Sequence, residues 1–331
     1  MSRARLAGTA ALATGGIGLI SMQAARAAAA RIEGNPDPFP RDQLAREPEG
    51  QEVFIDRPDG TVLRAVVAGR GPTVVLAHGF CVSLQEWNIV WEPLIARGYR
   101  VIAFDQRGHG RSTIGSAGIG SEPMADDYGA VLEHFDVHGG VLVGHSMGGF
   151  IAIRAVLDSP DVAPRLGGLV LFATWAGALL EGAPQNRAQL PLLRLGVLQR
   201  WARTKTGGVL FGAMQCGKTP SPVMISVFNE VFAQQNHQPL LPIVQAFMRE
   251  DRYRRLGEIT LPTVVMVGSA DRTTPPHHAQ RLAAGIPDAR LITIPDAGHL
   301  LNWECGGPEA LVDAITSLHQ KLPTGSTAAA P

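Results

Sequence analysis

The sequence predicts an α/β fold with a mostly parallel central sheet of about eight strands flanked by helices. Three observations lead to this prediction. From Glu52 onward, strand-like and helix-like segments alternate along the chain. Residues 73–77 form a continuous apolar run, as expected for a strand buried on both faces of a parallel sheet. Residues 141–149 pass from an apolar strand into Gly-x-Ser-x-Gly and then into helix-forming residues.

The sheet is expected to begin with an antiparallel hairpin, because the turn Arg57-Pro58-Asp59-Gly60 joins two strand-like segments. The expected strands are residues 53–55, 61–67, 73–77, 100–104, 141–143, 168–172, 261–267 and 290–294. One helix is expected to follow the strand 73–77 and its loop and to end at about Arg97. Further helices are expected over 124–137 and over 150–157. In a sheet of this kind, the functional loops lie at the carboxyl ends of the strands.

Composition limits the partners that this chain could have. Its 331 residues, 45% apolar and 18% charged, suffice for one large globular domain or two small ones. The 29 basic and 29 acidic residues give a net charge of zero. This balance gives no indication of a nucleic-acid partner and favours a neutral or apolar small-molecule ligand. The oligomeric state is left open.

The three cysteines, Cys81, Cys216 and Cys305, are too few and too scattered for a disulfide framework or a metal site. At most one disulfide can form, and one thiol must stay free. We expect neither a metal nor a cofactor.

The N-terminal residues 1–30 differ from the rest of the chain. Arg3 and Arg5 precede an uncharged run over 6–25, which ends in a small-residue pattern. This arrangement predicts a signal peptide or an N-terminal anchor, and hence export or membrane association. Four glycines make insertion of this run into a membrane less favourable. A disordered leader on a cytoplasmic enzyme is therefore the alternative. Residues 31–50 contain four prolines and are expected to form a linker or wrapping arm, and 323–331 a loose tail.

Ser146 is the candidate nucleophile, because it lies where a strand stops and a helix begins. Gly144 and Gly148 are expected on steric grounds, since strand and helix approach closely at such a turn. The helix N-terminus would direct N–H groups and a positive dipole end at an anionic intermediate. Taken alone, the pattern is also compatible with an ordinary strand-to-helix turn of a nucleotide-binding fold.

Five motifs in order extend this interpretation, and over residues 52–320 the chain resembles the α/β-hydrolase superfamily. The motifs are His78-Gly79-Phe80, the loop 105–112, Gly144 to Gly148, the loop 268–276 and Ala297-Gly298-His299. The resemblance implies a core of residues 51–172 and 259–322. The superfamily order of nucleophile, acid and histidine reads here Ser146, Asp271, His299. It also implies an oxyanion hole made by the backbone N–H groups of Phe80 and Met147.

Chemistry explains why these residue types are needed. A serine hydroxyl becomes a good nucleophile when an imidazole accepts its proton, and His299 could then return that proton to the leaving group. Asp271 would hold the histidine in the correct tautomer. Two alternatives exist: Asp271 could cap the helix that contains His277 and His278, and His299 could be a buried structural histidine.

Structural roles are expected for other residues near these loops. Packing is expected for His145, Cys81 and Cys305, and hydrogen bonding or loop support for His78, Asp105, Arg107 and His109. The serine at the turn disfavours dehalogenase and epoxide-hydrolase activities, which use an aspartate there. Because the loop His78-Gly79-Phe80 lacks extra glycines, bulky tertiary esters are also disfavoured.

Residues 173–258 do not fit the alternation and are expected to form a helical cap over the site. Three apolar stripes at helical spacing are expected to pack the cap and in part to line a pocket. They comprise Leu190, Leu193, Val197 and Trp201; Met224, Phe228 and Phe232; and Leu240, Leu241, Val244, Phe247 and Met248. The sequence thus predicts a serine hydrolase of carboxylic esters with apolar or lipid-like acyl groups, acting through an acyl-enzyme. A thioesterase, acyltransferase, carbon–carbon bond hydrolase, cofactor-free perhydrolase or non-turnover ligand receptor are the alternatives.

Overall fold

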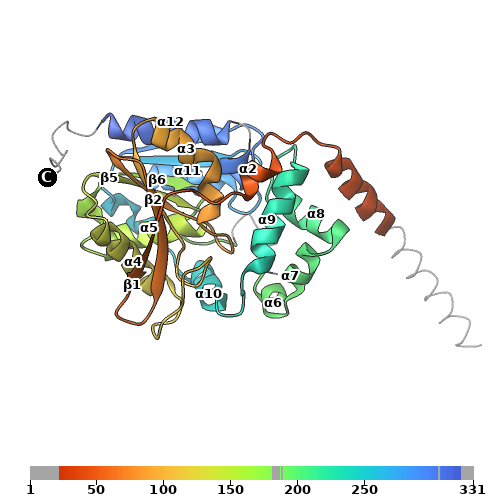
Figure 1. Cartoon of the computed structure of the whole chain (residues 1–331), viewed down its shortest axis with the longest axis horizontal. Helices are drawn as coiled ribbons and strands as arrows, with labels where there is room; N and C mark the ends of the chain where they lie inside the picture. Colours follow the sequence, from red (N-terminus) through yellow and green to blue (C-terminus); the bar gives the residue numbers. More distant parts are fainter. Residues whose placement is uncertain (1–21, 181–186, 188, 305, 322–331) are drawn as a thin grey trace, which may run out of the picture.

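The computed structural model describes residues 22–180, 187, 189–304 and 306–321. A sheet of eight strands runs through this part of the chain in the order β1-β2-β4-β3-β5-β6-β7-β8 (Figure 1). The antiparallel strands β1 (Gln51–Asp56) and β2 (Val62–Ala68) form one edge. The remaining strands are parallel: β3 (Thr73–Ala77), β4 (Arg100–Phe104), β5 (Gly140–His145), β6 (Leu166–Phe172), β7 (Thr263–Gly268) and β8 (Ala289–Ile294). The predicted fold class is therefore confirmed.

Two layers of helices cover the sheet. On one face lie α3 (Asn88–Ala96) and α12 (Gly307–His319), and on the other α4 (Ser121–His134), α5 (Met147–Asp158) and α11 (Pro276–Gly285). Short 3-10 segments lie in the described connections, among them η1 (Leu84–Trp87), η2 (Ala163–Arg165), η4 (Tyr253–Glu258) and η5 (Leu301–Trp303). Every residue of β3, β5 and β7 is buried, as the continuous apolar runs predict.

Helix α4 differs from its expected bounds, since it begins at Ser121 and ends at His134 rather than spanning 124–137. Pro123 lies in its first turn, where the missing N–H of proline leaves no helical hydrogen bond unmade. Just beyond its end, Asp136 has φ 47°, which the right-handed helix cannot continue through. The apolar period therefore located the helix but not its ends.

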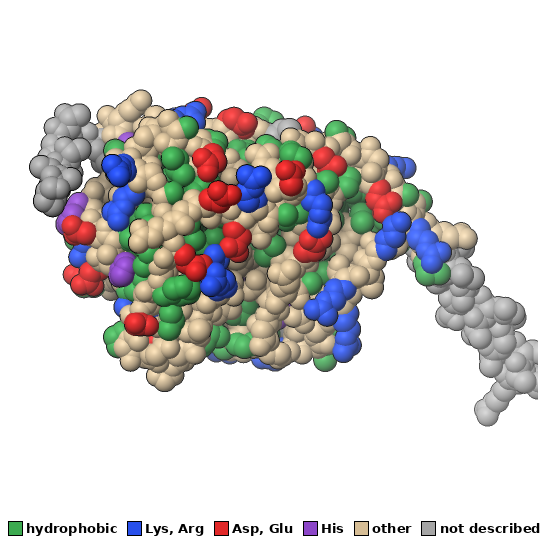
Figure 2. Space-filling view, in the orientation of Figure 1, with side chains coloured by type: hydrophobic (Ala, Val, Ile, Leu, Met, Phe, Trp, Pro, Cys, Tyr) green, Lys and Arg blue, Asp and Glu red, His purple; other side chains and the backbone are tan. Residues whose placement is uncertain are grey.

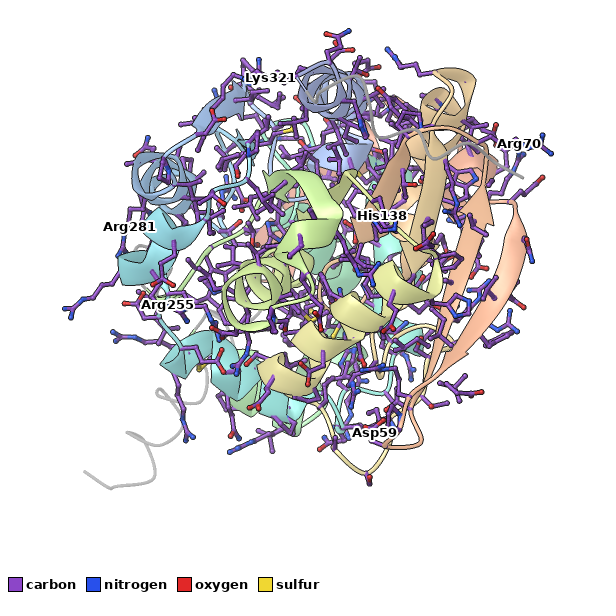
Figure 3. The ribbon with its side chains drawn as sticks, turned by 90° about the vertical axis from the view of Figure 1, so that its left-hand side faces the viewer. Asp59, Arg70, His138, Arg255, Arg281 and Lys321 are labelled. Atoms are coloured by element: carbon purple, nitrogen blue, oxygen red, sulfur yellow. The ribbon has the colours of Figure 1, made fainter. Side chains whose placement is uncertain are left out.

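The two edges of the sheet lie on opposite sides of the molecule. Figure 3 shows Arg255 and Arg281 on one side and Arg70, which follows β2, on the other. This agrees with a strand order that begins at β1 and ends at β8. On the face seen in Figure 2, basic and acidic side chains are intermixed over the core.

The insertion between β6 and β7 is helical. It contains α6 (Gln189–Arg194), α7 (Val197–Ala202), α8 (Lys205–Ala213), α9 (Pro222–Gln234) and α10 (Leu241–Arg249). Helices α6 to α9 lie together beside the core, and α10 lies closer to the core (Figure 1). The expectation of one apolar face running from Leu190 to Trp201 is wrong. Gly196 takes a left-handed conformation with φ 63° and separates α6 from α7, so Leu193 is buried while Trp201 is 42% exposed. The side chain of Leu190 lies outside the described ones.

An N-terminal arm joins the cap to the core. Residues 22–33 are helical, Ala29 is buried, and α2 (Arg41–Ala45) follows. The Asp37 carboxylate accepts a hydrogen bond from the backbone N–H of Val223 at 2.9 Å, at the start of α9. The Leu44 carbonyl accepts one from the Gln85 side chain at 3.1 Å, on η1 of the core. The arm therefore holds cap and core together.

Some predictions fall beyond the described residues. They concern residues 1–21 of the leader, the tail over 323–331, and Cys305. Among the described helices, none combines the length and the apolar character needed to cross a bilayer. Cys81 and Cys216 are buried free thiols.

Candidate active site

Ser146 occupies the sharp turn between β5 and α5. Its backbone has φ 51° and ψ −117°, a conformation that side chains rarely adopt. The flanking glycines have the steric role predicted for them. A Cβ on Gly144 would lie 2.6 Å from the Cα of Gly149, and one on Gly148 would lie 2.2 Å from the carbonyl oxygen of Ala77. The Ser146 N–H donates to the Phe172 carbonyl at 2.9 Å, which anchors the strained turn to β6.

The structure brings together the three residues proposed as a triad. His299 Nε2 lies 2.9 Å from Ser146 Oγ, and His299 Nδ1 lies 2.9 Å from Asp271 Oδ2. They follow β5, β7 and β8, whose parallel register sets their carboxyl ends at one edge of the sheet. All three side chains are almost completely buried. The hydrogen bond between Ser146 and His299 allows the serine to transfer its proton to the histidine.

The Asp271 carboxylate is fixed by its own loop. Oδ1 accepts the N–H groups of Thr273 and Thr274 at 2.8 and 2.9 Å, and Thr274 Oγ1 lies 2.8 Å from Oδ2. The alternative that Asp271 caps the following helix is wrong, because the N-cap of α11 is Pro275. Thr274 was not identified from the sequence as a site residue. The pattern Asp-x-x-Thr at a turn does indicate that the threonine hydroxyl can hydrogen-bond to the aspartate carboxylate.

Two backbone N–H groups flank the serine. Met147 is the first residue of α5, and Phe80 follows Gly79 in the loop after β3. In the part of the chain that the structure describes, neither N–H donates to another protein group. Gly79 packs against the turn, since a Cβ there would lie 2.9 Å from His145 Nδ1. The loop that carries Phe80 therefore lies directly beside Ser146.

A cavity of about 360 Å³ opens over Ser146 and His299. Both core and cap line it, and its wall is rich in aromatic rings: Phe80, Trp175, Trp201, Phe211, Phe228, Phe232 and Phe247. All three phenylalanines singled out in the cap sequence thus reach the cavity. The rings of Phe211, Phe228 and Phe232 contact one another, and Phe247 packs against Phe80, Phe150 and Trp175.

Comparison with known proteins agrees with this geometry. Residues 74–314 match the sequence model of the family described as the alpha/beta hydrolase family. The chain belongs to this family. A relative from Variovorax paradoxus with the provisional name carbamate hydrolase RutD is 32% identical over 69% of this chain and 85% of its own length.

Other relatives of this alpha/beta hydrolase carry different names. A 2-hydroxy-6-oxononadienedioate/2-hydroxy-6-oxononatrienedioate hydrolase from Cupriavidus pinatubonensis is 31% identical, with 70% of this chain and 82% of that protein covered. The solved structure of a thermophilic esterase from Thermogutta terrifontis is 27% identical, with a TM-score of 0.68, and covers 82% of this chain and 99% of that one. The family is shared, whereas the reactions in these names differ.

Behind the turn, this hydrolase contains a buried ion pair that the sequence did not reveal. Glu86 Oε1 contacts His145 Nδ1, and Glu86 Oε2 accepts the N–H of Gly79 at 2.8 Å. His145 Nε2 lies 3.0 Å from the His299 carbonyl oxygen. Burial favours the neutral forms, but mutual attraction outweighs it, lowering the pKa of Glu86 and raising that of His145. His145 therefore has a polar role rather than the packing role expected.

The remaining loop residues support the site. Asp105 Oδ1 accepts the N–H of Leu84 at 2.9 Å, and His78 Nε2 accepts that of Gln106 at 3.0 Å. Arg107 forms a buried ion pair with Asp127. Burial lowers the pKa of His109 to about 3, so this imidazole is neutral. The roles match those proposed from the sequence for these loops.

Proposed function

We propose that this alpha/beta hydrolase cleaves carboxylic esters with apolar acyl groups through an acyl-enzyme intermediate. The observation that carries the proposal is the line Ser146–His299–Asp271 at the floor of a cavity walled by aromatic and aliphatic side chains. A nucleophile of this kind suits acyl transfer, and a cavity of this kind suits an apolar acyl chain.

In the first half of the reaction, Ser146 Oγ attacks the ester carbonyl carbon while its proton moves to His299 Nε2. The carbonyl oxygen becomes an oxyanion, which the N–H groups of Phe80 and Met147 stabilise. When this intermediate collapses, the bond to the alcohol oxygen breaks and His299 returns the proton to that oxygen. The alcohol leaves, and the acyl group remains on Ser146.

In the second half, a water molecule takes the place of the alcohol. His299 accepts one of its protons as the oxygen attacks the acyl carbon, and a second oxyanion forms in the same position. Collapse breaks the bond to Ser146 Oγ, which recovers its proton from His299. Asp271 stays ionised throughout and stabilises the imidazolium.

The cavity favours apolar esters over the doubly charged substrate named for the Cupriavidus relative. A dienedioate carries two carboxylates, each of which needs a charged or hydrogen-bonding partner when it is desolvated. Among the described lining residues, Arg272 is the one lysine or arginine. An apolar acyl chain, by contrast, gains about 0.8 kcal/mol for each methylene that it buries.

The test is steady-state hydrolysis of p-nitrophenyl esters from acetyl to decanoyl by the full chain and its Ser146→Ala variant. We expect kcat/KM to rise about two- to fourfold per methylene until the cavity is full. Ser146→Ala should lower kcat by about 10⁴-fold or more without loss of folding. A flat chain-length series would disprove the acyl preference, and wild-type activity in the variant would disprove the nucleophile.

Export or membrane association through residues 1–30 stays a prediction, since most of this segment lies outside the described residues.

A further inference from the structure

A short segment of the cap, residues 215–218 between α8 and α9, lies against both loops that carry the triad. The Gln215 carbonyl accepts hydrogen bonds from the backbone N–H groups of His299, at 2.8 Å, and Leu300, at 3.2 Å. The Gln215 side-chain oxygen accepts one from Thr273 Oγ1 at 2.9 Å, in the loop of Asp271. One cap residue is thus bonded to the histidine loop and to the acid loop.

The rest of the segment continues along the histidine loop. The Glu304 carboxylate accepts the N–H of Gly217 at 3.0 Å and that of Gly298 at 2.9 Å, and so joins cap and loop. The Lys218 N–H donates to the Asp296 carbonyl at 2.8 Å. Four residues of the cap therefore follow the histidine loop, held by backbone hydrogen bonds and one shared carboxylate.

This contact leaves no space for a side chain. A Cβ on Gly217 would lie 1.9 Å from the Asp296 carbonyl oxygen, and one on Gly298 would lie 2.3 Å from the carbonyl carbon of Cys216. Two backbones meet directly here, so a movement of the cap segment must move the loop that holds His299.

The same segment borders the cavity, where Met214 and Gln215 form part of the wall. From these contacts we propose that residues 215–218 position the catalytic histidine and couple the filling of the cavity to the rate of the chemical step. The inference rests on the proposed ester hydrolysis. Gln215 and Gly217 are positioning residues, since they act through the histidine loop.

The coupling has a kinetic consequence. An acyl chain that fills the cavity packs against Met214 and Gln215, which restricts the segment and holds His299 at hydrogen-bonding distance from Ser146. A misplacement of a reacting group by about 1 Å can cost about 100-fold in rate. Acyl chain length should therefore raise kcat, and not only lower KM.

Gly217→Ala tests the contact, and Gly257→Ala is its matched control, because a Cβ on Gly257 meets nothing within 4 Å. With p-nitrophenyl hexanoate we expect Gly217→Ala to lower kcat by about 10- to 100-fold, with KM changed less than about threefold. The control should keep wild-type kcat. An equal loss in both variants, or a loss confined to KM, would overturn the proposal.

Gln215→Ala decides the question if Gly217→Ala does not fold. It removes the side-chain bond to Thr273 but keeps the backbone bonds to His299, and its melting temperature should stay close to that of the wild type. The ratio of kcat for hexanoyl to acetyl ester should fall at least threefold in this variant. An unchanged ratio would overturn the coupling.

The two proposals fail in different ways. If wild-type protein neither hydrolyses the esters nor is labelled at Ser146 by a fluorophosphonate, the proposed function is wrong. If wild-type protein is active and the folded variants match it in kcat and in labelling rate, only the coupling is wrong.

Discussion

The triad and the cavity above it are held in different ways. Ser146, Asp271 and His299 follow strands β5, β7 and β8, which belong to one hydrogen-bonded ladder with β6 between the first two. In the cap, the cavity wall is formed by helices such as α8 and α9, whose phenylalanine side chains pack against one another. Backbone hydrogen bonds thus determine where the chemistry occurs, and side-chain packing determines what fits. Changes at the triad should alter rate alone, whereas changes to the aromatic rings of the cap should alter stability and acyl preference together.

After the loss of the nucleophile itself, the largest effect is expected for Asp271→Asn. The amide can hold His299 in the wrong tautomer, so kcat for a p-nitrophenyl ester should fall by about 10³- to 10⁴-fold while folding is retained. Asp313→Asn, at an exposed carboxylate on α12, is the control and should have no effect. A loss of less than tenfold would show that another residue supplies the acid.

Phe247→Ala should have a smaller effect on rate and a large one on stability. The ring is 4% exposed, with its centre 5.2 Å from that of Trp175 and 5.4 Å from that of Phe150. Its removal should cost about 3–5 kcal/mol of unfolding free energy, measured in urea. The optimum of kcat/KM should move to longer acyl chains by at least one methylene.

The exposed Phe54 on β1 provides the matched control for this comparison. Phe54→Ala should leave the acyl optimum unchanged and should change the unfolding free energy by no more than about 1 kcal/mol. An unchanged acyl optimum in Phe247→Ala would mean that this ring only packs the cap against the core.

The smallest effect concerns Glu304, which joins the cap segment to the histidine loop. Burial raises the pKa of Glu304 to about 7 from its ordinary value of 4.5, and the charge of Asp271 acts in the same direction. Between these values the folded chain binds the proton more tightly than the unfolded chain, so this residue lowers stability as pH rises from about 5 to 7.

Glu304→Gln removes this titration and keeps a side-chain oxygen as acceptor. Relative to wild type, the unfolding free energy of the variant should therefore increase by about 1–3 kcal/mol between pH 5 and pH 8. Urea unfolding at both pH values measures the difference. A difference that is constant with pH would show that Glu304 keeps its ordinary pKa.

The sequence was most informative where local chemistry decides the structure. Buried strands need continuous apolar runs, and the turn at Ser146 needs glycines on steric grounds, so both could be located without a structure. The ends of α4 could not be located in this way. The apolar period alone places the start of the helix at residue 124, whereas the helix begins at Ser121 and includes Pro123. The break at Gly196 was also missed, since apolar residues continue at helical spacing on both sides of it.

The contacts that support the triad could not be predicted for a different reason. Glu86 meets His145, and Gln215 meets His299, only after loops from distant parts of the chain have folded against one another. No spacing in the sequence reports such a contact. The buried carboxylate of Glu86 lies between Leu84 and Trp87, two fully buried residues, and that apolar setting was the one available sign.

The N-terminal arm has a consequence for the order in which the protein folds. Asp37 bonds to a residue 186 positions later, on a cap helix that does not exist until most of the chain has been made. At a synthesis rate of about 5–20 residues per second, the arm waits about 10–40 s for its partner. During that interval the part of the arm around Asp37 lacks its partner on α9, although Leu44 can already bond to Gln85 of the core. If residues 1–30 direct export, the machinery that binds them meets an undocked segment, and docking of the arm onto α9 then becomes one of the last steps of maturation.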